Sequence, residues 1–289
     1  MSAVLLDGKA IADKILVSLE PRVDAIKKKR GRAPGLLVIA SDDKNRPSKA
    51  YRQAQLKACA AVGIRSQLAE SQWTEARYVL NVIEQMSDFD GVIIDLPLPK
   101  AVDVDELLSR LAPSRDAEGA TPHNYGRLFE IKSFDELRRK RLVAPCTALA
   151  VAELLRACGP PLAGKTAAML GRSNIVGKPA AHLLSCLDMT VTLCHSKTRE
   201  LPNIVAAADV VVAAMGRAHM VKADWIKPGA VVIDAGINAE GSQLVGDVEP
   251  AALERAGYIT PVPGGVGPVT NALLLANTVT LAERSLSQG

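Results

Sequence analysis

The chain of 289 residues is 48% hydrophobic but only 3% aromatic, and its formal net charge is +4. This length predicts two domains, because most domains contain about 100–200 residues. The modest positive charge is typical of an enzyme that handles anionic small molecules, and it falls short of the basic face of a nucleic-acid-binding protein. No apolar run reaches the roughly 18 residues of a membrane helix. We expect no signal peptide, because the opening residues lack a cationic start and include Asp7 and Asp13.

The cysteines and histidines indicate reduced thiols and no metal site. Five cysteines are an odd number, and none of them has the C-x-x-C spacing of a zinc or redox motif. The four histidines also lack the spacing of metal ligands. These residues are Cys59, Cys146, Cys158, Cys186, Cys194, His123, His182, His195 and His219. We therefore expect a cytoplasmic protein that binds no metal.

In the first half of the chain, helical and strand patterns alternate. Apolar residues from 8 to about 29 recur at helical spacing, and the basic run at 27–30 suits a helix C-terminus. Short apolar runs bounded by Gly and Pro predict buried strands. The predicted strands are 36–40, 66–69 and 91–96, and the predicted helices are 48–62 and 74–87. This alternation predicts a parallel sheet with helices on its faces.

A polar stretch from 112 to 141 separates this part from a second α/β region. A helix from 146 to about 158 is expected to lead into that region. Strands are predicted at 166–170, 190–194, 210–214, 230–234 and 258–261, with helices near 179–187, 203–208, 250–256 and 270–286. We therefore predict an α/β protein of two domains. Residues 1–146, completed by the helix 270–286, would form a parallel-sheet domain, and residues 147–269 a Rossmann-type domain.

The segment 166–179 has the pattern of a strand, a tight turn and a helix start. Gly171 permits the turn, Gly177 lets the backbone approach a phosphate, and Pro179 suits the first turn of a helix. Backbone N–H groups at such a helix start bind phosphate. However, Ser173 replaces the middle glycine of the usual G-x-G-x-x-G motif. For this motif alone, ordinary strand-to-helix packing is an equally good interpretation.

The end of the next predicted strand favours NADP over NAD. An NAD site usually has Asp or Glu about 20 residues downstream, which binds the ribose 2′-hydroxyl. Here the strand runs into Cys194-His-Ser196-Lys-Thr198 without a carboxylate, and Arg172 lies in the first turn. Cationic and hydroxyl groups at these places suit a 2′-phosphate. We predict NADP as the cofactor, and a basic solvated loop is the alternative.

Six segments of three to ten residues have the pattern of sequence motifs. They are Leu6–Lys9, Asp95–Pro99, Gly171–Pro179, Asp234–Asn238, Gly246–Val248 and Pro261–Thr270. In this order they resemble the bifunctional methylenetetrahydrofolate dehydrogenase/methenyltetrahydrofolate cyclohydrolase family (FolD) over nearly the whole chain. The Pro-Gly-Gly-Val-Gly-Pro element of the last segment is highly specific. The resemblance implies a cytoplasmic homodimer that binds a tetrahydrofolate one-carbon substrate beside NADP, in a cleft between two domains.

The resemblance also assigns residues by position. The implied NADP-binding residues are Gly171, Arg172, Ser173, Ser196 and, at the nicotinamide end, Ile237. The implied folate-binding residues are Tyr51, Asp95, Glu118, Gly264, Gly265 and Pro268. The segment 210–214 and its flanking helices resemble the part of the family that forms the dimer.

The chain departs from the family at three candidate catalytic positions. The family motif Tyr-x-x-x-Lys here runs from Tyr51 to Gln55, so an amide stands where the catalytic lysine is expected. Asp95 replaces the glutamine of Gln-Leu-Pro-Leu-Pro, and Glu118 replaces the aspartate expected to bind the pterin. Losing the lysine and gaining Asp95 would make the site about two charges more negative. These changes indicate a divergent paralogue with an altered folate pocket.

The two family reactions depend differently on these positions. Hydride transfer from methylenetetrahydrofolate to the nicotinamide needs orientation more than a proton-transfer group. Hydrolysis of the methenyl cation needs a positioned acid–base group, which Gln55 does not provide. We therefore predict a dehydrogenase with weak or absent cyclohydrolase activity. Two alternatives remain: both activities with Asp95 as a new base, or a folate- or NADP-binding protein without catalysis.

Overall fold

The computed structural model describes residues 2–42, 48–241 and 243–287, and for residues 48–51 it describes the backbone only. The chain divides into two compact units. Unit 1 comprises residues 1–12 and 128–270, and unit 2 comprises residues 13–127 and 271–289. Two long helices, α1 (Gly8–Arg30) and α10 (Val266–Ser285), begin in unit 1 and continue into unit 2. No helix in the described part of the chain is long and apolar enough to cross a membrane.

Unit 2 is built on a parallel three-stranded sheet in the order β3-β2-β4. Its strands are β2 (Gly35–Ser41), β3 (Arg65–Ser71) and β4 (Gly91–Ile94). All seven residues of β2 are buried, as expected for a central parallel strand covered on both faces. The three predicted strands are thus confirmed, except that β4 ends before Asp95, which follows it at the carboxyl edge of the sheet.

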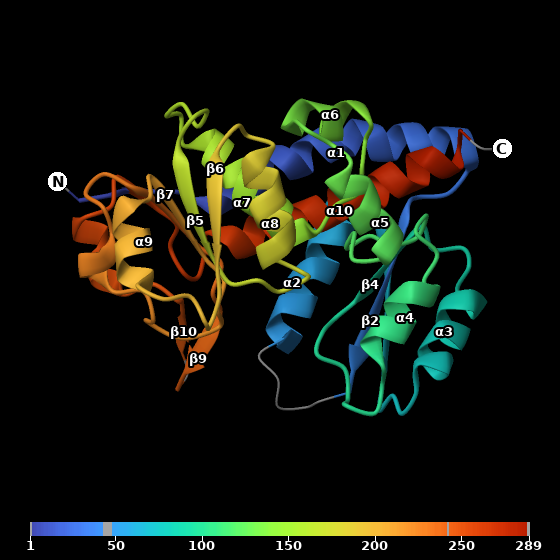
Figure 1. Ribbon diagram of the computed structural model, residues 1–289. Coiled ribbons are helices and arrows are strands. Elements are labelled where there is room, and N and C mark those ends of the chain that lie inside the picture. The colour runs from blue at the N-terminus through green and yellow to red at the C-terminus, as the bar shows by residue number, and fades with distance from the viewer. Residues whose placement is uncertain (1, 43–47, 242, 288–289) are drawn as a thin grey trace. The chain divides into compact units, whose positions relative to one another are not determined.

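Helices cover this sheet. On one face, α3 (Ala76–Gln85) and α4 (Val104–Arg110) lie side by side and bury Val79 and Leu107 against Leu37 and Ile39 (Figure 1). Against β4, α10 packs so closely that a side chain on Gly91 would touch Thr278. The remaining helices of the unit are α2 (Ser48–Ala61) and α5 (Pro122–Phe129). The sequence indicated α2 and α3 but not α5, which lies in the stretch expected to be irregular.

Unit 1 contains a six-stranded parallel sheet in the order β1-β11-β8-β7-β5-β6. The strands are β1 (Val4–Leu5), β5 (Thr166–Leu170), β6 (Thr190–Cys194), β7 (Val210–Ala213), β8 (Val231–Asp234) and β11 (Tyr258–Ile259). Apart from β1, this is the 2-1-3-4-5 order of a doubly wound fold. The predicted nucleotide-binding architecture is therefore confirmed, and β1 at the edge is a strand that the sequence did not indicate.

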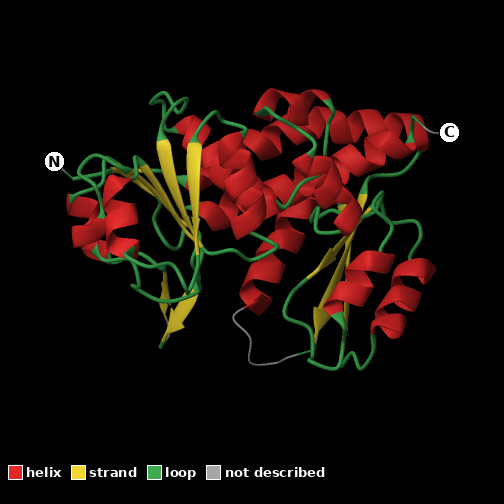
Figure 2. Cartoon of the chain, in the orientation of Figure 1, coloured by secondary structure: helices red, strands yellow, loops and turns green. Residues whose placement is uncertain are grey.

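The helices of unit 1 flank this sheet. α9 (Leu201–Ala207) and two 3₁₀ helices, η1 (Ala223–Trp225) and η2 (Pro250–Glu254), cover the face that carries Ala168 and Leu170. α7 (Cys146–Ala157) and α8 (Gly177–Ser185) contact each other and the strands. The unit also contains α6 (Phe134–Arg139) and an antiparallel pair, β9 (Asn238–Glu240) and β10 (Gln243–Val245) (Figure 2).

The position of β7 bears on the predicted dimer-forming part, which comprises the segment 210–214 and its flanking helices. β7 is paired on both sides, with β5 and β8, and all four of its residues are buried. A strand in the middle of a sheet has no free edge and offers no surface to a second subunit. Within the predicted dimer-forming part, only the flanking helices can offer a surface to a second subunit.

Candidate functional site

The turn between β5 and α8 lies at the carboxyl edge of the unit 1 sheet. Gly171 has a φ of +117°, and a Cβ there would overlap the carbonyl oxygen of Ala214. Its N–H donates to the carbonyl of Cys194 at 3.0 Å, which ties the turn to the end of β6. Because β5 lies between β6 and β7, this turn is at the switch point where doubly wound sheets bind their ligands.

The side chain of Ser173 stabilises this turn. Its Oγ accepts hydrogen bonds from the N–H groups of Val176 and Gly177, both at 3.2 Å, and so caps the start of α8. A Cβ on Gly177 would overlap the carbonyl group of Gly171. Gly177 was expected to make room for a phosphate, whereas the atoms that crowd it belong to the turn itself. The serine in place of the motif's middle glycine therefore closes the turn.

Arg172 and Ser196 lie at the same edge of the sheet. They follow Leu170 and Cys194, which are paired in register between β5 and β6. Both residues are exposed. The turn at 195–198 is closed by a 2.8 Å hydrogen bond from the His195 N–H to Thr198 Oγ1. An arginine, a hydroxyl group and the turn from Gly171 to Gly177, which forms a cradle at the start of α8, fit the phosphates of a dinucleotide.

Asp234, at the end of β8, organises the segments around Ile237. Its carboxylate accepts backbone N–H bonds of 2.8–3.0 Å from Gly236, Asp247 and Val248. A side chain on Gly246 would overlap this carboxylate. Burial raises the pKa of Asp234 to about 6, and the three N–H donors oppose that rise. Ile237 is 64% exposed just beyond this network, at the carboxyl edge.

A second buried carboxylate, that of Asp247, continues the network. It accepts N–H bonds from Gly216 at 2.9 Å and from Arg217 at 2.8 Å, and a 2.9 Å bond from the side-chain amide of Asn238. These contacts hold the loop after β7 beside the loop after β8. The motif segments 234–238 and 246–248 thus have a structural task that the sequence analysis did not identify.

The first and last motif segments pack against each other within unit 1. The N–H of Gly8 donates to the carbonyl oxygen of Gly264 at 3.0 Å. A Cβ on Gly8 would overlap the carbonyl oxygen of Gly265, and Gly264 itself has a φ of +107°. Pro268, in the first turn of α10, is half-buried. The glycines of this loop are therefore required by close backbone contacts.

In unit 2, α2 carries the residue that departs most from the family motif. The side chain of Gln55 is buried, with 2% of the residue exposed. Its Nε2 has no hydrogen-bond partner in the described part of the chain. An unsatisfied buried N–H group is costly, so this amide is suited to an acceptor on a bound molecule. Tyr51 lies one turn earlier on α2, but its side chain lies outside the described residues.

Arg52, also on α2, pairs with two carboxylates at the carboxyl edge of the unit 2 sheet. Asp95 follows β4, and Glu70 lies near the end of β3. Its Nη1 lies 2.8 Å from Asp95 Oδ2, and its Nη2 lies 2.7 Å from Glu70 Oε1. The Arg52 side chain is only 4% exposed. The negative charge gained at Asp95 is therefore matched by a buried guanidinium. The charge count made from the sequence had not included this ion pair.

Glu118 lies in a loop that Asp116 holds in place. The Asp116 carboxylate accepts hydrogen bonds from the Gly119 and Thr121 N–H groups and from the Asn124 side chain, at 2.7–2.8 Å. Beside this loop, the buried hydroxyl of Tyr125 has no hydrogen-bond partner among the described residues. Burial and the charges of Glu118 and Asp116 raise the pKa of Tyr125. The hydroxyl therefore stays protonated and remains a donor.

Together, these features define a class. A doubly wound unit with a dinucleotide cradle, and an α/β unit with polar side chains at its carboxyl edge, are typical of a two-domain nucleotide-dependent oxidoreductase. The family described as tetrahydrofolate dehydrogenase/cyclohydrolase matches this chain twice, with its catalytic domain at residues 6–118 and its NAD(P)-binding domain at residues 145–286. The chain belongs to this family.

Individual relatives support the same assignment. The chain is 44% identical to a bifunctional protein FolD of Pelobacter propionicus, over 99% of this chain and 100% of the relative. Among solved structures, it resembles the methylenetetrahydrofolate dehydrogenase-cyclohydrolase of Trypanosoma brucei in complex with NADP and an inhibitor, with a TM-score of 0.89, 38% identity and 99% of each chain covered. The FolD enzyme of Campylobacter jejuni gives a TM-score of 0.89 at 36% identity, covering 98% of this chain and 100% of that one. The expected family and the nucleotide cofactor are thereby confirmed.

Proposed function

We propose that this protein is an NADP-dependent dehydrogenase that oxidises 5,10-methylenetetrahydrofolate to 5,10-methenyltetrahydrofolate and hydrolyses the methenyl product weakly or not at all. The observation that carries this proposal is Gln55. Its buried Nε2 has no hydrogen-bond partner in the described part of the chain, and the resemblance places it where the family has its catalytic lysine. Such a group can orient a substrate by hydrogen bonding, but it does not exchange a proton at neutral pH.

Oxidation of methylenetetrahydrofolate depends little on the three positions at which the chain departs from the family. The nicotinamide, when bound, accepts the hydride. The protein has to hold the substrate carbon in line with it, which requires fixed donors and excluded water. Gln55 Nε2 and the Tyr125 hydroxyl are two buried donors without partners in the described residues, and both belong to unit 2. They are suited to bind acceptor atoms of a pterin.

Hydrolysis of the methenyl cation demands a group that activates water and moves a proton. Asp95 is the alternative base, but its Oδ2 is already engaged by the guanidinium of Arg52. A charge-assisted bond of this kind holds the Asp95 carboxylate against α2 and makes it less available as a base for water. A guanidinium group does not act as an acid–base group at neutral pH, so Arg52 does not replace the lysine. The ion pair therefore favours the dehydrogenase over the bifunctional alternative.

NADP is the preferred nucleotide in this proposal. Arg172 and Ser196 follow paired residues of β5 and β6, where an NAD enzyme has an acid.

We further propose that residues 1–146 with the helix 270–286 form the folate-binding domain, that residues 147–269 form the NADP-binding domain, and that the enzyme is a homodimer. The five cysteines are all free and buried. Free thiols suit a reducing compartment such as the cytoplasm.

The test is an assay of NADP reduction with methylenetetrahydrofolate as substrate. The proposal expects NADPH to form in proportion to enzyme, and Gln55→Met, which keeps the size but removes the donor, should lower kcat/KM. Binding of both ligands without NADPH formation would instead support a non-catalytic folate- and NADP-binding protein. An active enzyme that hydrolyses methenyltetrahydrofolate rapidly, and loses this activity in Asp95→Asn, would support the bifunctional alternative.

A further inference from the structure

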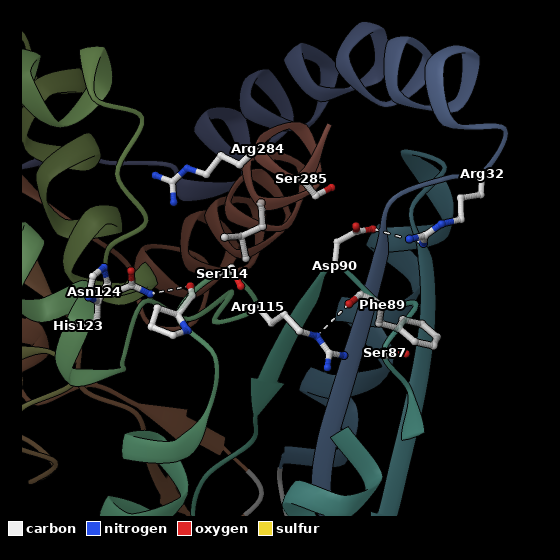
Figure 3. A pocket seen from close by; sticks show the side chains of 12 residues that line it. Arg32, Ser87, Phe89, Asp90, Ser114, Arg115, His123, Asn124, Arg284 and Ser285 are labelled. Carbon is white, nitrogen blue, oxygen red and sulfur yellow. Dashed lines mark hydrogen bonds and ion pairs between the residues drawn. The ribbon is translucent and has the colours of Figure 1, made fainter. Parts of the chain in front are cut away.

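A cavity of about 500 Å³ opens in unit 2 at the edge of the sheet opposite Asp95 (Figure 3). Its lining includes Phe89 and Asp90, which directly precede β4, whereas Asp95 follows that strand. Other lining residues come from the segment after α1, from the start of α5 and from the end of α10. The volume lies within the range of small-molecule sites. None of the folate- or NADP-binding candidates lines this cavity.

The charge of the lining is strongly positive. Arg32, Arg115 and Arg284 line the cavity, and Asp90 is the one carboxylate among its described lining residues. Asp90 is held chiefly by Arg30, which does not line the cavity: Arg30 binds both of its oxygens at 2.6 Å, and the N–H of Gly35 donates to it at 2.8 Å. Arg32, within the lining, also lies 3.9 Å from Asp90 Oδ2. The described lining thus carries three guanidinium groups and one carboxylate.

Arg115 is held in place by backbone carbonyl groups. Its guanidinium donates to the carbonyl oxygens of Ile83, Met86 and Phe89 at 2.6–3.1 Å, which fixes its plane. No carboxylate lies within ion-pair distance of Arg115 among the described residues. Burial lowers its pKa below the ordinary value of an arginine, yet the group remains charged at neutral pH. A half-buried cation without a paired anion favours the binding of one.

We propose that this cavity binds a small phosphate-bearing anion. Guanidinium groups bind phosphate oxygens through paired N–H donors, and three of them match a ligand with two or more charges. Ser114, beside Arg115, adds a hydroxyl donor to the same lining. The cavity is large enough for a diphosphate or a phosphate ester. The site is distinct from the NADP site, whose cradle lies in unit 1, and the inference does not depend on the proposed reaction.

Isothermal titration of inorganic pyrophosphate into the full-length protein saturated with NADP tests this inference, because the nucleotide site is then occupied. We expect one site with a dissociation constant below about 1 mM. Arg32→Gln and Arg284→Gln should each weaken binding about tenfold or more. Arg77→Gln, which removes an exposed arginine of α3 outside the cavity, should leave binding unchanged. No binding by the unmodified protein, or equal weakening in all three variants, would overturn the proposal.

A second variant and a second anion sharpen the test. Ser114→Glu places a carboxylate beside Arg115, so it should abolish pyrophosphate binding and raise the Tm of the unliganded protein at low salt. Pyrophosphate binding that persists in Ser114→Glu would contradict the site. Citrate carries similar charge without phosphorus and should bind at least tenfold more weakly. Citrate binding as tight as that of pyrophosphate would overturn the assignment to phosphate.

Discussion

The guanidinium of Arg52 lies 2.8 Å from the carboxylate of Asp95, three residues before Gln55 on the same helix. The family motif has lysine at the position of Gln55 and glutamine at the position of Asp95. In this chain, the cation at the lysine position is lost, an acid is gained at the glutamine position, and Arg52 pairs with that acid. The ion pair therefore links helix α2, which carries Gln55, to the residue that follows β4.

Breaking this ion pair should destabilise the protein. Arg52→Met removes the charge but keeps most of the stem, and leaves Asp95 and Glu70 without their shared cation. We expect the free energy of unfolding to fall by about 1–3 kcal/mol, as for a buried partner left unsatisfied. Denaturant unfolding measures this, with Arg77→Gln at an exposed pair as the control. In a double-mutant cycle with Asp95→Asn, strictly additive effects would show that the two residues do not interact energetically.

Restoring the motif lysine should restore hydrolysis. Gln55→Lys places an amine one helical turn after Arg52, and the neighbouring positive charge lowers the pKa of that amine. Because Asp95 is already paired with Arg52, it does not hold the new lysine in an ion pair. We expect hydrolysis of methenyltetrahydrofolate to rise by about 100-fold, as for a positioned acid–base group. Gln55→Met is the matched control, and a rise of equal size in this variant would rule out proton transfer as the cause.

The nucleotide site should discriminate between NADP and NAD. With Arg172 and Ser196 at the carboxyl edge, we expect NADP to bind at least about 10-fold more tightly, a difference of about 1.4 kcal/mol. Arg172→Ala should narrow this difference, whereas Arg139→Ala, at an exposed position on α6, should not. Fluorescence titration of both nucleotides gives the ratio, and equal affinities in the unmodified protein would refute the assignment.

One carboxylate of unit 1 makes stability depend on acid pH. Lys227 at 2.7 Å and the Thr166 N–H at 3.0 Å hold the pKa of Asp209 at about 2, below its ordinary 3.8. A depressed pKa stabilises the folded state above the unfolded value, and this contribution is lost as the pH falls toward 2. As the pH falls from about 4 to about 2, the free energy of unfolding of Asp209→Asn should therefore decrease less than that of the unmodified protein. Asp13→Asn, on the exposed side of α1, should follow the unmodified protein in acid unfolding.

The sequence predicted most of the regular elements because they are driven by local patterns. Buried apolar runs located β2, β5, β7 and β8, since central parallel strands are apolar on both faces. Two-residue strands such as β1 carry no such pattern and are fixed by pairing with distant segments. Likewise, α5 lies in a polar stretch whose helical start depends on hydrogen bonds to Asp116.

The sequence predicted candidate site residues from their positions in the family motifs. It did not predict the contacts that connect these motifs to other segments. Arg52 occupies a variable position of the Tyr-x-x-x-Lys motif, so its role becomes visible only when Asp95 and Glu70 are found within 3 Å. Asp234 and Asp247 stood inside recognised motifs, yet their task as acceptors for backbone N–H groups follows from the loop geometry alone. In each case the signal is a contact between segments that are distant in sequence.

The most direct test of the central claim is one progress curve that follows two products. The unmodified enzyme is mixed with methylenetetrahydrofolate and NADP, and NADPH and methenyltetrahydrofolate are measured together by their absorbance. We predict that NADPH forms and that methenyltetrahydrofolate accumulates in nearly equal amount, decaying only at the uncatalysed rate of the same buffer. NADPH formation without methenyl accumulation, with the methenyl form disappearing in proportion to enzyme, would contradict the account.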